Sequence, residues 1–166
     1  MTIQFKNGEE YYNKIYTVFN LSVAITLLPF GYLVLEKHSG RLESLPISSW
    51  QLWVITLPLL LIIALLIRWS QHTFKAEKEA ARQVEGLRPK LLAFYNCLFK
   101  RFAVFTGISG LSTVMLYLTG SGFFIMAYVG AMIFLSLSRP TLNLIIEALQ
   151  LNPTDEQILI EKKDIP

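Results

Sequence analysis

Long apolar runs without charge constrain this sequence more than any other feature. Residues 15–35 and 54–67 contain no Asp, Glu, Lys, Arg or His. At 1.5 Å per residue, a helix of about 21 residues reaches about 31 Å, roughly the thickness of the bilayer hydrocarbon. Of the 166 residues, 53% are hydrophobic and only 16% are charged, which is more apolar surface than a soluble core absorbs. The sequence therefore predicts an all-α, polytopic membrane protein.

We expect four transmembrane helices, at about residues 15–35, 52–69, 102–118 and 123–137. Trp50 and Trp53 precede the second apolar run and Trp69 follows it, as in the aromatic belts of membrane interfaces. The third and fourth spans are short, and an uncharged Thr-Gly-Ser-Gly turn joins them. These spans form a predicted transmembrane domain, residues 15–138, preceded by a cytoplasmic segment, residues 1–14.

The connection between the second and third spans, residues 70–101, is predicted to be a cytoplasmic helical loop. Residues 71–85 are rich in good helix formers and contain no breaker, so the second helix is expected to continue into water. Residues 91–102 have two interpretations. They form either a separate helix lying in the membrane interface, or the first turns of the third span, with Lys100 and Arg101 reaching outward.

The last segment, residues 139–166, is predicted to be a cytoplasmic amphipathic helical tail. Its apolar residues recur at the helical spacing i, i+3, i+4 and i+7: Leu142, Ile145, Ile146 and Leu149. We expect Ser138 to cap the start of this helix, with Pro140 in its first turn. Thr154 and Gln157 have the spacing of a capping box for a last short helix.

The distribution of Lys and Arg predicts the orientation. With both termini in the cytoplasm, 13 of the 15 basic residues lie on the cytoplasmic side, and only Lys37 and Arg41 lie outside. Three spans would place the basic residues of the tail outside and weaken this asymmetry. Residues 1–14 lack the apolar core of a cleavable signal peptide, and we expect the bacterial inner membrane as the location.

The sequence contains no pattern that predicts an enzyme, and we assign no catalytic, cofactor-binding or metal-binding residues. No Asp, Glu, Lys, Arg or His lies in the centre of an expected span, which argues against proton-coupled transport. His38 and His72 are expected on opposite sides of the membrane, where they cannot share a metal ion. The net charge of +3 comes with no nucleic-acid-binding motif, so nucleic acid is not an expected partner.

Single residues leave further alternatives open. Cys97, the only cysteine, is either a small apolar interfacial residue or a site of reversible lipidation. Pro29 and Pro58 each free a backbone carbonyl one turn earlier, and this either shapes helix packing or opens a cavity.

Small residues gather in the last two spans. The third span contains Ala103, Thr106, Gly107 and Gly110, and the fourth contains Ala127 and Ala131. Such spacing allows close approach of two helices, either within the hairpin or between molecules.

These features predict a non-catalytic accessory, scaffold or assembly subunit that acts through its cytoplasmic helices. Its expected partners are the lipid bilayer and copies of itself or other membrane proteins. The alternative is an oligomeric channel or uncoupled transporter lined by uncharged polar residues: Asn20, Ser22, Thr26, Ser109, Ser112 and Thr113. An enzyme acting on lipids ranks third, because the sequence pairs no nucleophile with a base.

Overall fold

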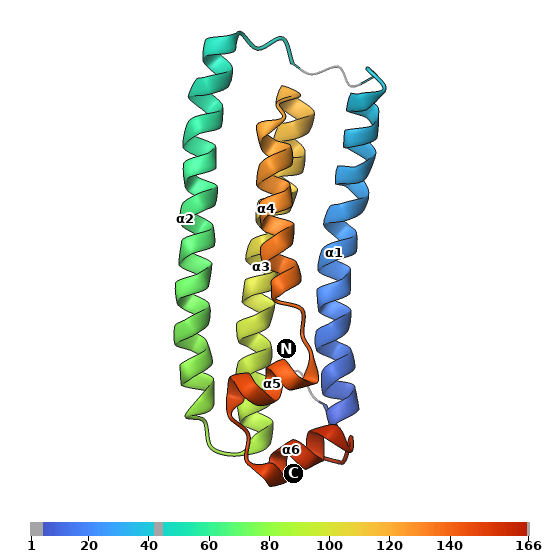
Figure 1. Ribbon diagram of the computed structural model, residues 1–166, viewed down its shortest axis with the longest axis vertical. Helices are drawn as coiled ribbons and strands as arrows, with labels where there is room; N and C mark the ends of the chain where they lie inside the picture. Colours follow the sequence, from blue (N-terminus) through green and yellow to red (C-terminus); the bar gives the residue numbers. More distant parts are fainter. Residues whose placement is uncertain (1–4, 42–44, 166) are drawn as a thin grey trace.

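The computed structural model describes residues 5–41 and 45–165, which form α-helices joined by short connections (Figure 1). The helices are α1 (Gly8–His38), α2 (Ser49–Arg82), α3 (Leu87–Thr119), α4 (Phe123–Leu137), α5 (Leu142–Leu149) and α6 (Pro153–Ile160). Within the described ranges no residue belongs to a β-strand. The all-helical prediction is confirmed.

Three helices, α1, α2 and α3, are long and apolar enough to cross a membrane. A fourth passage exists if α4 and α5, which meet at a 75° bend, count as one broken span. Large apolar side chains such as Leu28, Leu61 and Met126 are more than 60% exposed, as expected where lipid replaces water. The structure thus agrees with a multi-pass membrane protein of three to four spans.

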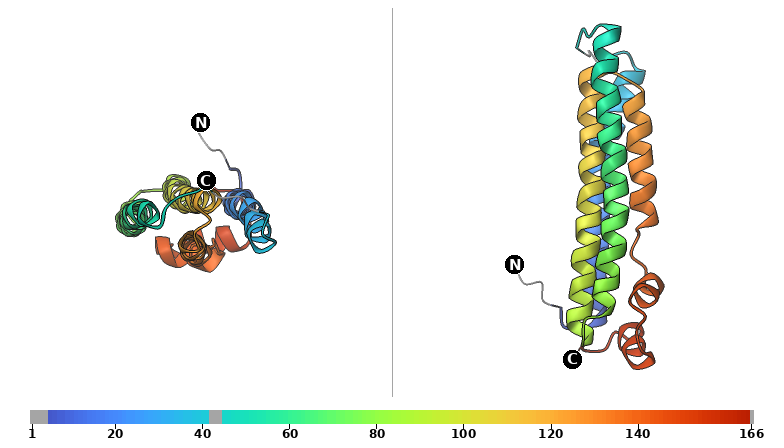
Figure 2. Two further views of the ribbon diagram at one scale, coloured as in Figure 1. Left: turned by 90° about the horizontal axis from the view of Figure 1, so that it is seen from above. Right: turned by 90° about the vertical axis from the view of Figure 1, so that its left-hand side faces the viewer.

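The long helices are arranged around α3. Helices α1 and α2 flank it on opposite sides, and α4 covers one of its faces (Figure 2). The core along α3 is built from aromatic and aliphatic side chains that are at most 1% exposed, among them Phe94, Phe102 and Phe105. On α1, Tyr11 is fully buried, and its hydroxyl donates to the carbonyl of Leu91 at 3.1 Å.

The end of the bundle that carries α5, α6 and the α2–α3 turn will be called the basic end, after the cations around it. Here both ends of the described chain meet, because the amide of Gly8 donates to Lys163 O and that of Ile165 donates to Lys6 O. Lys162 pairs with Glu9 at 3.0 Å. A Cβ at Gly8 would lie 3.1 Å from the Leu159 carbonyl oxygen, a tight contact that glycine avoids.

Two arginines attach the C-terminal helices to the long ones. Arg82 Nε donates to Ala148 O at 2.6 Å, and an Arg88 guanidinium nitrogen donates to Ile165 O at 2.7 Å. On α5, Ile145 and Leu149 are buried while Glu147 is exposed, so the amphipathic prediction is confirmed and its apolar face packs within the chain.

Residues 91–102 are part of the continuous helix α3, which argues against a separate interfacial helix. The predicted extension of the second helix is also present, because α2 continues to Arg82. Pro29 and Pro58 lie inside α1 and α2 without ending them, and both are exposed.

Both predicted helix caps in the tail are wrong. Ser138 has near-helical backbone angles and ends α4, where its hydroxyl donates to Phe134 O at 2.7 Å. The cap of α5 is Thr141, whose extended backbone lets its side chain accept from the Leu144 amide at 3.2 Å. Asn152 is the N-cap residue of α6, because Pro153 takes the first helical position and moves Thr154 inside the helix.

Candidate functional site

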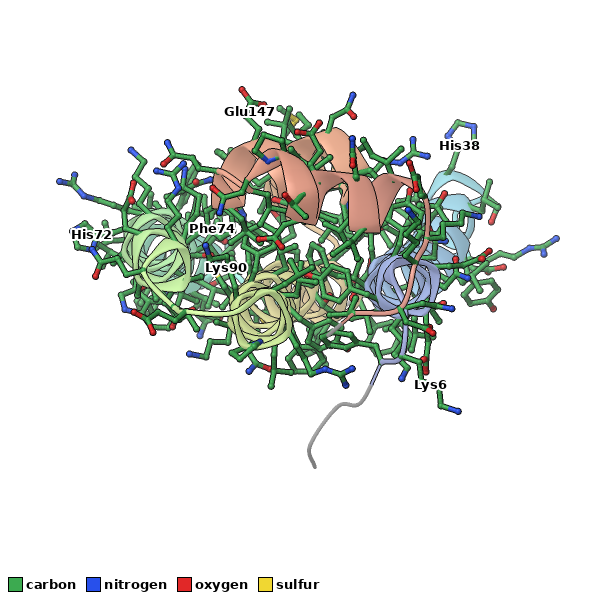
Figure 3. The ribbon with its side chains drawn as sticks, turned by 90° about the horizontal axis from the view of Figure 1, so that it is seen from below. Lys6, His38, His72, Phe74, Lys90 and Glu147 are labelled. Carbon is green, nitrogen blue, oxygen red and sulfur yellow. The ribbon has the colours of Figure 1, made fainter. Side chains whose placement is uncertain are left out.

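A cavity of about 310 Å³ lies between α2 and α3 near the basic end. Its walls include Trp69, Phe74 and Glu77 from α2 and Cys97, Lys100 and Arg101 from α3. Viewed from the basic end, Phe74 points from α2 into the bundle, whereas His72 on the same helix points away from it (Figure 3). A volume near 300 Å³ is at the small end of the range for ligand pockets.

Arg101 is the central charged group of this cavity. Its guanidinium carbon lies 4.2 Å from the centroid of the Phe74 ring and 5.8 Å from that of Phe105. One of its terminal nitrogens donates to Gln71 Oε1 at 3.3 Å. Its Nε is buried and has no hydrogen-bond acceptor among the described residues. Stacking on aromatic faces is typical of Arg, but it does not satisfy an N–H donor.

The neighbouring charges in the cavity are already paired. Lys100 Nζ lies 2.6 Å from Glu77 Oε1, so the one carboxylate of the cavity wall is matched by a lysine. Within residues 5–41 and 45–165, no carboxylate forms an ion pair with Arg101. The cavity therefore has a net positive charge.

Cys97 lies on the wall of the cavity and is only 3% exposed. It precedes the expected span 102–118 by five residues, and its thiol lies 3.8 Å from Phe74 O. Burial raises the pKa of the Cys97 thiol to about 12, and nearby Glu77 acts in the same direction. This environment agrees with a small packed residue rather than with a reactive thiol.

A second cavity, of about 370 Å³, shares Phe74 and Arg101 with the first and is also lined by residues of α5. Its charged wall residues are Lys78, Arg82, Arg101 and Glu147. Arg82 also pairs with Glu79 at 2.7 Å. Arg101 thus belongs to both cavities, and basic side chains outnumber acidic ones in each.

The polar residues of the predicted pore are not gathered at this site. Ser112 and Thr113 turn back to their own helix, donating at 2.8 Å to Ile108 O and Ser109 O. On α1, the hydroxyls of Thr26 and Ser22 likewise donate to backbone carbonyls of their own helix, Ser22 O at 3.1 Å and Val18 O at 2.9 Å.

Asn20 is exposed. Four hydroxyls are buried without a partner in the described structure: that of Ser109, from the predicted pore set, and those of Thr56, Thr106 and Tyr128.

His38 and His72 lie on opposite sides of the bundle and both are exposed (Figure 3). In the described part of the chain, no three or more His, Cys, Asp or Glu side chains are grouped as a metal site would require.

Small residues on the two last long helices face in different directions. On α4, Ala131 is fully buried and Ala127 is half-buried, as expected for packing inside the bundle. On α3, Ala103 and Gly107 are exposed, and a Cβ added at Gly107 or Gly110 would meet no atom within 4 Å. The small-residue face of α3 is therefore directed away from the hairpin.

The sequence interpretation missed the cavity because it treated Lys100 and Arg101 only as interfacial cations. Phe74 was the available signal. It is the one Phe, Tyr or Trp in residues 70–82 of α2, but its pairing with Arg101 depends on how α2 and α3 are aligned.

Comparison with known proteins finds no matching family model, no similar curated protein and no similar solved structure. The fold and the site thus define only a class: all-helical proteins whose helices are apolar enough to cross a membrane three or four times.

Proposed function

We propose that this protein is a non-catalytic assembly subunit of the bacterial inner membrane, which associates with a second copy of itself along α3 and acts through helices at its cytoplasmic end. In this proposal the basic end is cytoplasmic and the chain crosses the membrane four times. The excess of Lys and Arg in the segments at that end supports the orientation.

The observation that carries the proposal is the outer face of α3, which we define by its residues at helical spacing: Phe99, Ala103, Gly107, Gly110, Val114 and Tyr117. Helices α1 and α2 flank this face without covering it, and α4 lies on the opposite side (Figure 2). Gly107 and Gly110 have open space above them.

A second copy suits this face for physical reasons. Lipid offers no hydrophobic gain for helix association, so membrane helices associate where small residues allow close backbone contact. The outer face has small residues at its centre and no charged group among its members. In a dimer with a two-fold axis, both subunits use the same surface patch. The small residues at the centre of one outer face would then pack against those of the other.

Replacing Gly107 by leucine tests the proposal. The open space around Gly107 means that the new side chain meets nothing in its own chain, so the fold of one copy should be retained. The leucine should hold a second helix away and weaken association by roughly tenfold or more. Native mass spectrometry of the gently solubilised protein would show wild-type dimers and G107L monomers.

The matched control is Gly31→Leu on α1, because Gly31 also has open space around it but lies away from the outer face of α3. This variant should remain a dimer. A monomeric wild-type protein, or equal loss of dimers in G31L and G107L, would contradict the proposal.

The second candidate is an oligomeric channel or uncoupled transporter. Four buried hydroxyls lack partners within the described residues and favour it, because a hydrated path would satisfy them: those of Thr56, Thr106, Ser109 and Tyr128. Reconstituted liposomes distinguish the two functions. A channel would pass ions or small polar solutes, whereas an assembly subunit would leave the liposomes tight.

A further inference from the structure

The buried side of Arg101 lacks a counter-charge. Its Nε is shielded from solvent without an acceptor, and no carboxylate among the described residues pairs with it. A partly buried guanidinium without an anion is costly, because desolvation penalises the charge and leaves donors unsatisfied. An anion entering the cavity would supply both the charge and the acceptor.

The depth of the cavity in the membrane indicates where that anion comes from. Arg101 directly precedes the expected span 102–118, and Trp69, on the cavity wall, closes the expected span 52–69. Trp69 is 57% exposed, as expected of an interfacial tryptophan that contacts lipid. Both helices thus place the cavity at the level of lipid headgroups.

The walls of the cavity combine two kinds of chemistry. Phe74, Trp69 and Val104 provide an apolar surface that suits the upper part of an acyl chain. Arg101 provides planar donors, the geometry that matches phosphate oxygens. Glu77 would repel an anion, but Lys100 neutralises it at 2.6 Å. Beyond Arg101, Lys78 and Arg82 add positive charge in the second cavity, with Glu147 as the opposing charge on its wall.

We propose that the cavity between α2 and α3 binds one anionic phospholipid, with the lipid phosphate on Arg101 and the start of an acyl chain against Phe74 and Trp69. A free inorganic phosphate has the same charge chemistry, but it makes no use of the apolar walls. The site is independent of the outer face of α3, so loss of lipid binding and loss of dimers are separate outcomes.

The test uses the full-length protein in mild detergent with added phosphatidylglycerol or phosphatidylcholine of identical acyl chains. Native mass spectrometry measures retained lipid, and the thermal unfolding midpoint measures stabilisation. We expect one phosphatidylglycerol to be retained and to raise the midpoint, with a much smaller effect of phosphatidylcholine. Inorganic phosphate should raise the midpoint little, and equal stabilisation by inorganic phosphate would overturn the assignment to a lipid.

Arg101→Gln should weaken phosphatidylglycerol binding by roughly tenfold, because a charge-assisted hydrogen bond is lost. The matched control is Arg68→Gln, which removes an exposed cation at a similar depth that does not line the cavity. Equal losses in R101Q and R68Q would mean general surface attraction and overturn the proposal.

Arg101→Lys is the second variant, to be used if R101Q fails to fold, because lysine keeps the positive charge. It should bind with intermediate affinity, and wild-type affinity in R101K would overturn the role of the guanidinium.

Discussion

At the scale of single residues, burial decides the chemistry available to Cys97. Its two readings from sequence, packed residue or lipidation site, differ in the accessibility that each requires. The thiol is 3% exposed, and burial raises its pKa to about 12. The raised pKa keeps the thiol in its unreactive protonated form at pH 8.

Cys97 should therefore react with a water-soluble maleimide at pH 8 only when the protein is unfolded in a strong detergent. The reaction would be followed by the mass increase of the intact protein. The matched control is Asn96→Cys combined with Cys97→Ser, since residue 96 is the exposed neighbour on the same helix. This control should react rapidly in the folded protein. Comparable rates at positions 96 and 97 in the folded state would contradict the burial of Cys97.

At the scale of helices, the sequence predicted local features well and alignments between helices poorly. The predicted helix bounds 123–137 are those of α4, because Gly120 and Gly122 break the chain before it. The caps failed where Ser138 and Thr141, only three residues apart, were both suitable. Which of the two residues caps α5 depends on how far α4 continues before the 75° bend between α4 and α5.

The same limit explains the cavity. The sequence marks Arg101 as a cation and Phe74 as an aromatic residue on different helices. The distance of 4.2 Å between the Arg101 guanidinium carbon and the Phe74 ring centroid follows from the packing of α2 on α3. Local patterns contain no information on this alignment, so the cavity was not predictable from them.

The corrected cap of α5 can be tested with Thr141→Ala. Loss of the side-chain acceptor for the Leu144 amide should destabilise the start of α5 by about 1 kcal/mol. Hydrogen exchange of the first-turn amides of α5 should then become about five times faster. Thr154→Ala is the matched control, because Thr154 lies inside α6 and does not cap it. If T154A accelerated exchange in α6 to the same degree, the original capping-box interpretation would be right.

At the scale of the whole molecule, most of the polar contacts between distant parts of the chain lie at one end. The segments around Gly8 and Lys163 are bonded to each other, and Arg82 and Arg88 attach the C-terminal helices there. At the opposite end, Lys37 Nζ donates to the carbonyl of Gly120 and joins α1 to the α3–α4 turn. Chain segments that meet at one end of a bundle lie on the same side of a membrane that the bundle crosses. Because Lys and Arg are enriched in the cytoplasmic segments of membrane proteins, we predict that this side faces the cytoplasm.

This orientation can be measured with single cysteines in a Cys97→Ser background. Ser39→Cys lies at the end of α1 opposite the basic end, and Gln157→Cys lies on α6; both positions are exposed. A membrane-impermeant maleimide should label residue 39 in intact bacterial cells and residue 157 only after lysis. The reverse pattern would place the basic end outside, against the distribution of Lys and Arg. Labelling of both positions in intact cells would mean that α4 and α5 do not return the chain to the cytoplasm, and the broken helix pair would then not count as a fourth crossing.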